Sequence, residues 1–180
     1  CRASYQARYE MIIVNDGSTD ESWNILTRAT HETPLLRAIN LSRNFGQQAA
    51  LSCGLEHARG DHLLILDADL QDPPALIEKL YVKAKEGYEV VYAKRNLRKG
   101  ESAFKTITAK LFYRLLTKIT SIEIPIDTGD FRIISRKVVD VLKKMPEQQK
   151  FLRGQIAWVG FKQTAVTYDR DERTDGKSGY

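Results

Sequence analysis

The 180-residue sequence is poor in cysteine and histidine. It contains two cysteines, Cys1 and Cys53, and three histidines, His31, His57 and His62. Two cysteines cannot form the disulfide framework of a small secreted domain, and the histidines lack the close spacing of a zinc site. The sequence therefore predicts a reducing compartment and argues against a fold held together by disulfides or structural zinc.

Long apolar runs and flexible linkers are also missing. No apolar stretch approaches the roughly 20 residues that a membrane-spanning helix needs, and the N-terminus lacks a secretory pattern. No stretch has the Gly/Ser-rich or Pro-rich composition of an interdomain linker. With 42% hydrophobic residues, the chain is long enough to bury a complete core. We therefore expect one soluble domain over residues 1–180.

The net charge of +5 is unevenly distributed. Residues 94–118 contain eight basic residues and one acidic residue, Glu101, so this segment carries +7 and the rest of the chain −2. A local basic excess points to an anionic ligand or surface, whereas nucleic-acid-binding chains more often interleave basic and aromatic residues. We therefore expect an anionic partner and no nucleic acid.

The most informative stretch is an apolar run at residues 63–66 that ends abruptly in polar side chains. The run predicts a buried strand, and Pro73 and Pro74 suit the first turn of a following helix. Asp67 and Asp69 are two residues apart, so both side chains leave the same side if the strand continues to Asp69. The carboxyl ends of strands in an α/β sheet are where ligands bind.

These two carboxylates, with the nearby amide oxygen of Gln71, suit a hard divalent cation such as Mg²⁺ or Mn²⁺. An alternative is that the aspartates only solubilise the strand end and cap the next helix. An EF-hand loop also fits the positions of the aspartates, Gln71 and Glu78. It is excluded because Asp72 stands where the loop needs glycine, and no helix precedes it.

Strand and helix signals alternate along the chain. We expect strands at 9–14, 36–41, 63–66, 88–93 and 161–168, and helices at 47–58, 73–86, 102–120, 135–144 and 151–159, with a further helix after the turn 15–20. Alternation at this spacing predicts an α/β fold with a mostly parallel central sheet and helices on both faces. Residues 124–132 are expected to form a polar loop around a glycine turn.

The first of these strands ends in an Asp-Gly-Ser turn. Asp16 is placed to accept a hydrogen bond from a ligand N–H such as a nucleobase imide. The ordinary alternative is a strand, a turn and a helix, with Ser18 or Asp20 as the helix cap.

Arginines follow two other strands. Arg43, after the second strand, suits a phosphate or a base, with a solvated arginine as its alternative, and Arg95 follows the fourth strand. Because the carboxyl ends of parallel strands meet at one edge of a sheet, we expect these side chains to share a rim with Asp16.

The segment 102–120 predicts an amphipathic helix. Its apolar residues recur every three or four positions, and Lys110, Arg114 and Lys118 form a basic row at every fourth position. Such a helix either packs on the core with a solvated basic face or lies among the headgroups of an anionic membrane. The two interpretations are compatible with each other.

Five motifs, in this order, resemble those of family 2 glycosyltransferases with the GT-A fold. Within that family they are most similar to the polyprenyl-phosphate sugar transferases, the group of the bactoprenol glucosyltransferases and dolichol-phosphate mannose synthase. The motifs are 14–20 (VNDGSTD), 40–46 (NLSRNFG), 67–74 (DADLQDPP), 127–132 (DTGDFR) and 173–178 (RTDGKS). The resemblance extends over residues 9–180.

This resemblance implies an inverting hexosyltransferase that moves a hexose, with glucose expected, from a UDP-sugar to a polyprenyl phosphate such as bactoprenol phosphate, with Mg²⁺ or Mn²⁺ as cofactor. The site residues it implies are Asp16, Ser18, Arg43 and Asp67 for the nucleotide, Asp67, Asp69 and Gln71 for the metal, Arg95, Arg136, Arg173 and Ser178 for phosphate groups, and Asp127, Asp130 and Arg132 for the reacting centre. The resemblance does not choose between Asp127 and Asp130 as the residue beside the reacting atoms.

The chain departs from the family pattern at two positions. Asn15 stands where relatives often carry a second acidic residue, and Gly179 stands where a phosphate-binding lysine commonly follows the serine. Relatives also begin with a further strand and usually end in transmembrane helices. We therefore expect residues 1–180 to be a catalytic fragment of a longer protein of the cell envelope, held on the cytoplasmic face of the membrane through 102–120. A homo-oligomer is left open.

Other functions compete with this one. A glycosyltransferase of the same fold with a saccharide or other acceptor is one alternative. A sugar-1-phosphate nucleotidylyltransferase is another, although it predicts a Gly-rich phosphate loop where this chain has only Asp16-Gly17-Ser18. A non-catalytic module that binds anions or membranes is the third, and it predicts binding that is indifferent to UDP and Mn²⁺.

Overall fold

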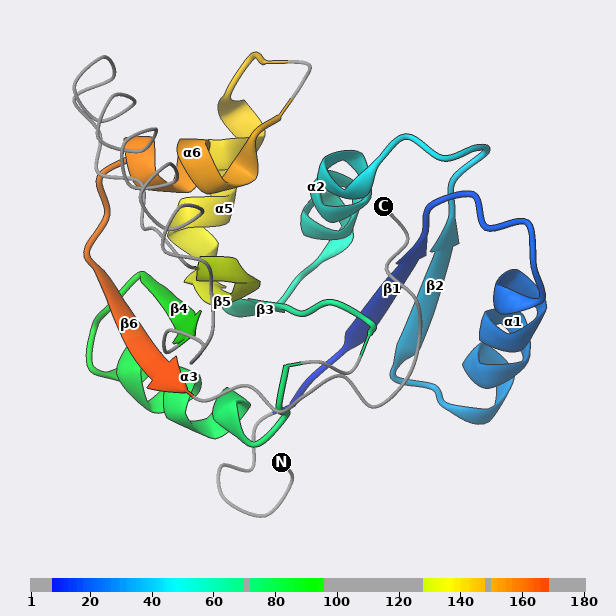
Figure 1. Ribbon diagram of the computed structural model, residues 1–180, viewed down its shortest axis with the longest axis horizontal. Helices are drawn as coiled ribbons and strands as arrows, with labels where there is room; N and C mark the ends of the chain where they lie inside the picture. Colours follow the sequence, from blue (N-terminus) through cyan, green and yellow to red (C-terminus); the bar gives the residue numbers. More distant parts are fainter. Residues whose placement is uncertain (1–7, 70–71, 96–127, 148–149, 169–180) are drawn as a thin grey trace, which may run out of the picture. The chain divides into compact units, whose positions relative to one another are not determined.

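The computed structural model describes residues 8–69, 72–95, 128–147 and 150–168. Its elements, in chain order, are β1 (Met11–Asn15), α1 (Ser22–Glu32), β2 (Leu36–Asn40), α2 (Gln47–His57), β3 (His62–Ile65), α3 (Leu76–Lys85), β4 (Val90–Arg95), β5 (Thr128–Ser135), α5 (Arg136–Lys144), α6 (Leu152–Trp158) and β6 (Gln163–Tyr168) (Figure 1). The predicted α/β class is confirmed, and most predicted elements are present with ends shifted by a few residues.

The described residues form two compact units. Unit 1 takes its residues from Cys1–Leu63 and Ser135–Val159, and unit 2 from Leu64–Ile134 and Gly160–Tyr180. Each unit is described by itself below. The expectation of one domain over 1–180 stays a prediction.

Unit 1 contains a pair of parallel strands. β1 pairs with β2 from Met11 opposite Leu36 to Asn15 opposite Asn40, so the two strands end side by side. α1 contacts β2 and α2 contacts β1 (Figure 1). Gly54 of α2 faces this strand, and a Cβ at that position would be in ordinary van der Waals contact with a methyl group of Val14, at 3.6 Å.

The second part of unit 1 is the helix pair α5 and α6, which contact each other. The Ser135 hydroxyl accepts a hydrogen bond from the N–H of Val138 and so caps α5. The apolar faces of the two helices supply buried side chains to this unit, namely Val138, Val139, Leu142, Leu152 and Ile156. Each such side chain contributes about 1.5–3 kcal/mol on burial, and their spacing of three and four residues is why these segments are helical.

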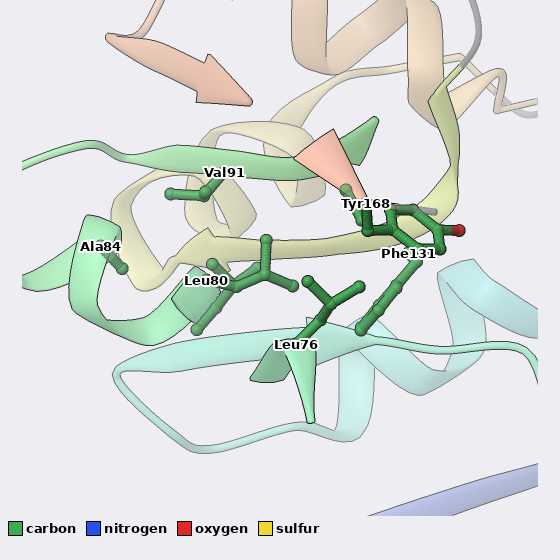
Figure 2. Close-up of a cluster of buried hydrophobic side chains, with 8 residues drawn as sticks. Leu76, Leu80, Ala84, Val91, Phe131 and Tyr168 are labelled. Carbon is green, nitrogen blue, oxygen red and sulfur yellow. The ribbon is translucent and has the colours of Figure 1, made fainter. Parts of the chain in front are cut away.

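Unit 2 is built on a four-stranded sheet of order β3-β5-β4-β6. β4 runs parallel to β6 and antiparallel to β5. The apolar face of α3 packs against the sheet through Leu76, Leu80 and Ala84, which meet Val91, Phe131 and Tyr168 in one buried cluster (Figure 2). This cluster is the core that holds the ends of the strands in place.

Strand β5 corrects the predicted polar loop at 124–132 for the residues that the structure describes. Thr128–Ser135 is an eight-residue strand in the interior of the sheet, and its Phe131, Ile133 and Ile134 are buried. The glycine and the charged residues at its start favour a turn locally, but pairing with β4 and burial of the apolar residues prevail. The sheet therefore contains an antiparallel strand among the expected parallel ones.

No helix within the described residues has the length and apolar character needed to cross a membrane. The helix predicted at 102–120 lies outside the part of the chain that the structure describes.

Candidate active site

In unit 1, Asp16 joins the loop after β1 to the loop after β2. Its Oδ1 accepts a hydrogen bond from the N–H of Phe45 at 2.8 Å, and its Oδ2 accepts one from the N–H of Gly46 at 2.9 Å. Gly46 is the N-cap of α2 and has no side chain to cap the helix. Asp16 supplies that cap from another strand and places its negative charge at the positive end of the helix dipole.

The two loops also touch through Gly17 and Arg43. Gly17 has a φ of 67°, and a Cβ there would lie 2.3 Å from the carbonyl carbon of Arg43, so only glycine fits. The Arg43 guanidinium stacks 4.1 Å from the centroid of the Phe45 ring, and both side chains are exposed. Asp16, Arg43 and Phe45 therefore lie on one pair of packed loops.

Asn15, where relatives often carry an acid, has a clear role in this chain. Its side chain is 6% exposed, and its amide donates a hydrogen bond of 2.7 Å to the side-chain oxygen of Asn40. The side-chain oxygen of Asn15 accepts a hydrogen bond of 3.4 Å from the N–H of Ser18, which is one of the predicted nucleotide-binding residues. An aspartate at position 15 has no N–H to donate to Asn40, so the asparagine suits this pair.

Two electrostatic effects bear on the chemistry of unit 1. Hydrogen bonds from the hydroxyl and the main-chain N–H of Ser22 lower the pKa of Asp20. The bond from the main-chain N–H satisfies a donor in the first turn of α1. Burial, with a smaller effect from Glu56, raises the pKa of the Cys53 thiol. Because the thiolate is the nucleophilic form, Cys53 is poorly suited to covalent catalysis.

In unit 2, the predicted metal ligands follow β3. The strand ends at Ile65 and a turn is present at Ala68 and Asp69, so the strand does not continue to Asp69 as the pleat argument required. Asp67 is half-buried and Asp69 is exposed. Aspartate favours turns over strand interiors, which explains why the strand stops before the two carboxylates.

The ends of the other strands of unit 2 meet at one edge of the sheet. In the register of β4, Lys94 lies opposite Thr128 at the start of β5, and Arg95 lies opposite Tyr168 at the end of β6. The Tyr168 hydroxyl donates a hydrogen bond to Oδ1 of Asp72, just before the two prolines. Asp72, which follows Asp67 and Asp69 in the acidic segment 66–72, thus lies next to the end of β6, at the same end of the sheet as Arg95 and the start of β5.

Asp130 and Arg132, both predicted at the reacting centre, form a buried ion pair in β5. Their side chains are 8% and 4% exposed, and Nη2 of Arg132 lies 3.2 Å from Oδ1 of Asp130. The same nitrogen donates to the carbonyl of Gly129 at 2.8 Å. The guanidinium is therefore fixed by its own strand, and the pair stiffens the residues next to the sheet edge.

Arg136 is engaged with the main chain of unit 1. Its guanidinium donates hydrogen bonds to the carbonyls of Ala58 at 2.9 Å and Gly60 at 2.6 Å, and its N–H donates to the carbonyl of Asp61 at 2.8 Å. These bonds tie the start of α5 to the segment before β3. Its phosphate-binding role stays a prediction.

The donor chemistry of Asp67 and Asp69 fits Mg²⁺ or Mn²⁺ that shares its coordination with a diphosphate. Within the described ranges, no three or more His, Cys, Asp or Glu residues gather closely enough to hold a metal ion. Two carboxylates provide only oxygen donors and leave most of the shell to water and phosphate oxygens, which is the usual situation for Mg²⁺. Gln71, Asp127, Arg173, Ser178 and the side chain of Arg95 lie outside what the structure describes.

Comparison with known proteins identifies the family. The sequence profile of glycosyl transferase family 2 matches residues 1–142. The chain belongs to this family. The glycosyltransferase YkcC of Bacillus subtilis is 54% identical over 96% of this chain and 53% of that protein. The bactoprenol glucosyl transferase of Shigella phage SfX is 39% identical over 95% of this chain and 56% of that protein. The chain thus spans about half the length of these relatives.

The fold of this family 2 chain is that of GT-A glycosyltransferases. The mannosyltransferase PcManGT of Pyrobaculum calidifontis, solved in complex with GDP-Man and Mn²⁺, superposes with a TM-score of 0.62 at 22% identity, covering 95% of this chain and 49% of that one. The predicted family, GT-A fold and enzyme class are therefore confirmed.

Sequence reasoning missed the contact between Asp72 and Tyr168. Asp72 belongs to the motif 67–74 and Tyr168 ends the strand predicted at 161–168, and neither pattern points to the other residue. The two residues are 96 positions apart, so no local pattern joins them. A tyrosine at the end of a buried strand, whose hydroxyl needs a partner, was the one available signal.

Proposed function

We propose that this family 2 domain is the catalytic part of an inverting hexosyltransferase that moves a hexose, with glucose expected, from a UDP-sugar to a polyprenyl phosphate. The observation that carries the proposal is the 39% identity to a bactoprenol glucosyl transferase over 95% of the chain. The order of the five motifs supports it. The activity of the whole protein belongs to the proposal, because the chain spans 56% of that relative.

Asp16, Ser18, Arg43 and Asp67 are proposed to bind the nucleotide, with Asp16 contacting its base. Each Asp16 oxygen already accepts one main-chain N–H, which fixes the carboxylate in place. A carboxylate oxygen has a second lone pair, so Asp16 can still accept the imide N–H of uracil. The anchoring makes Asp16 a pre-organised acceptor, which lowers the entropic cost of binding.

Asp67, Asp69 and Gln71 are proposed to hold Mg²⁺ or Mn²⁺. Such a cation, when bound, supplies positive charge that neutralises the departing UDP. Arg95, Arg136, Arg173 and Ser178 are proposed to bind phosphate groups of donor and acceptor, and arginine suits this because its fork matches two phosphate oxygens. For Arg136 this role competes with its bonds to Ala58 and Gly60.

The proposed reaction is a single displacement. A phosphate oxygen of the lipid attacks the anomeric carbon and forms the new C–O bond, while the bond from that carbon to the β-phosphate oxygen breaks and UDP leaves with the electron pair. A phosphate monoester with a second pKa of about 6 is largely dianionic at neutral pH, so no strong base is needed. Asp127, Asp130 and Arg132 are proposed at the reacting centre, with the choice between Asp127 and Asp130 left open, and Asp130 and Arg132 form a buried ion pair in β5.

The test is a transfer assay. The protein is incubated with Mn²⁺, polyprenyl phosphate and UDP-glucose, UDP-galactose or GDP-mannose, and sugar in the lipid extract is measured. We expect lipid-linked glucose, lost at least a hundredfold in Asp67→Ala/Asp69→Ala, because removing ligands removes the cation. The control Glu78→Ala/Glu86→Ala, which deletes two exposed carboxylates of unit 2, should retain turnover.

The metal assignment is tested by the double variant, and two rival functions are tested by parallel incubations, one with a free saccharide in place of the lipid and one with UTP and a sugar 1-phosphate. Full metal-dependent turnover in the double aspartate variant contradicts the metal assignment. Transfer only to a free saccharide contradicts the lipid acceptor and favours another acceptor on the same fold. Formation of UDP-sugar and diphosphate from UTP and a sugar 1-phosphate favours the nucleotidylyltransferase.

The membrane partner is also a proposal. We propose that the basic helix predicted at 102–120 lies on the anionic cytoplasmic face of the cell membrane, where a polyprenyl phosphate presents its headgroup. The charge of +7 in segment 94–118 supports this, because each basic residue near an anionic surface contributes about 1 kcal/mol.

A further inference from the structure

The acidic segment that carries Asp67 and Asp69 is anchored at both ends to the sheet of unit 2. β3 and β6 are the two edge strands in the order β3-β5-β4-β6. The segment leaves β3 after Ile65, and seven residues later Asp72 accepts a hydrogen bond from Tyr168, the last residue of β6. It therefore begins at one edge strand and ends at the other.

This anchor is buried and rigid on the tyrosine side. Asp72 is 3% exposed and Tyr168 is 7% exposed. The Tyr168 ring belongs to the apolar cluster with Phe131 and Leu76, and its hydroxyl oxygen points away from the aliphatic side chains (Figure 2). A ring packed in the core cannot follow a moving loop, so the hydroxyl defines where Asp72 lies. A buried carboxylate without its donor is unfavourable, so Asp72 stays with it.

The seven residues from Ile65 to Asp72 are longer than the gap that they cross, so the anchor at Asp72 limits where Asp67 and Asp69 can lie. Three strand spacings separate β3 from β6, about 14 Å, whereas seven residues can span about 23 Å. The segment is longer than the gap, so if it were attached only at β3, the two aspartates could occupy many positions. Fixing Asp72, three residues after Asp69, restricts them.

We propose that Tyr168 and Asp72 are positioning residues for the cation site of Asp67 and Asp69. The inference rests on the proposed function and deepens it. Asp72 is not itself a ligand in this proposal, because its Oδ1 is bound to Tyr168 inside the unit. It holds the end of the acidic segment so that the two carboxylates keep the spacing that a shared cation needs.

The experiment compares the 180-residue chain with Tyr168→Phe and the control Tyr88→Phe. Tyr88 packs against the same cluster, and the control removes a hydroxyl while the ring that faces Lys162 stays. Mn²⁺ is titrated in the presence of UDP by calorimetry. We expect Tyr168→Phe to weaken Mn²⁺ binding about tenfold or more, as losing support of a metal ligand does, with Tyr88→Phe unchanged. Equal Mn²⁺ binding in Tyr168→Phe and wild type overturns the proposal.

Amide hydrogen exchange gives a second readout that needs no metal. In Tyr168→Phe, the peptide covering 66–72 should exchange faster than in wild type, while the peptide covering α3 stays protected. Asp72→Asn keeps an oxygen that can accept from Tyr168, so it should retain more protection and more Mn²⁺ affinity than Asp72→Ala. Equal losses in the two Asp72 variants, or unchanged exchange in Tyr168→Phe, contradict the positioning role.

The two readouts separate failure of this inference from failure of the proposed function. If the wild-type chain binds UDP and Mn²⁺ independently of each other, the proposed function fails, and with it the metal-positioning role. If wild type couples the two ligands and Tyr168→Phe couples them equally well, only the positioning role fails. Uniformly faster exchange across unit 2 in Tyr168→Phe means a general loss of packing and likewise contradicts it.

Discussion

Asp16 joins the two candidate nucleotide loops. Both of its oxygens accept main-chain N–H groups, at 2.8 and 2.9 Å. It therefore holds two loops together before any ligand binds. Under the proposed function, changing Asp16 would remove both a ligand contact and this loop contact, and stability measurements report the loop contact alone.

We expect Asp16→Asn to lower the free energy of unfolding by about 1–2 kcal/mol, because an amide NH₂ replaces one acceptor and faces a main-chain N–H. Urea denaturation at pH 7 measures this. The control is Asp140→Asn, an exposed carboxylate 4.0 Å from Arg136, which should change stability by about 0.5 kcal/mol or less. Unchanged stability in Asp16→Asn would show that the two N–H bonds contribute nothing net.

Among the elements, β5 depends most on its surroundings. It begins with glycine and charged residues, yet it lies inside a four-stranded sheet and pairs with β4. The buried charges of Asp130 and Arg132 are tolerated because they neutralise each other and the arginine also binds main-chain oxygens. Removing one of the two charges takes away a buried ion pair and is therefore expected to destabilise the sheet.

We expect Asp130→Ala to cost about 3–5 kcal/mol of stability, because it removes the buried carboxylate that lies 3.2 Å from the guanidinium of Arg132. The double variant Asp130→Ala/Arg132→Met should be more stable than Asp130→Ala alone, since neither charge remains. Guanidinium denaturation of the two single variants, the double variant and wild type gives the coupling energy. If the stability losses of the two single variants add up to the loss in the double variant, Asp130 and Arg132 are not energetically coupled.

At the scale of the whole molecule, the positive charge is concentrated in one segment of the chain. Segment 94–118 carries +7 against a total of +5, so the remaining chain is slightly acidic. A concentrated basic charge of this kind favours association with anionic surfaces, and salt weakens such association.

We expect the chain to bind vesicles that contain anionic lipid and to leave them in high salt. Replacing Lys110, Arg114 and Lys118 with glutamate should lower the partition coefficient between vesicles and water by roughly a hundredfold or more, since each basic residue contributes about 1 kcal/mol. The control reverses three exposed lysines elsewhere, Lys79, Lys85 and Lys144, for the same change of net charge. Equal loss in the two triple variants would show that only net charge matters. Vesicle sedimentation measures the outcome.

The sequence alone determined the α/β class, the order of most elements and the family. These properties rest on local signals. Apolar periodicity separates strands from helices, and glycine and proline mark the ends of elements. The motifs around Asp16 and Asp67 are contiguous, so they are legible without a structure. The segments predicted at residues 47–58 and 135–144 are helices in the structure, with ends that differ by one residue.

The tertiary structure alone decided which residues support the candidate site. Asp16 meets Gly46 across 30 positions, and Asp72 meets Tyr168 across 96. It also placed β5 inside a sheet, against the local preference of its first residues for a turn. The physical reason is the same in each case: these contacts join strands and loops far apart in the chain, and their free energy comes from pairing and burial that exist only in the folded protein.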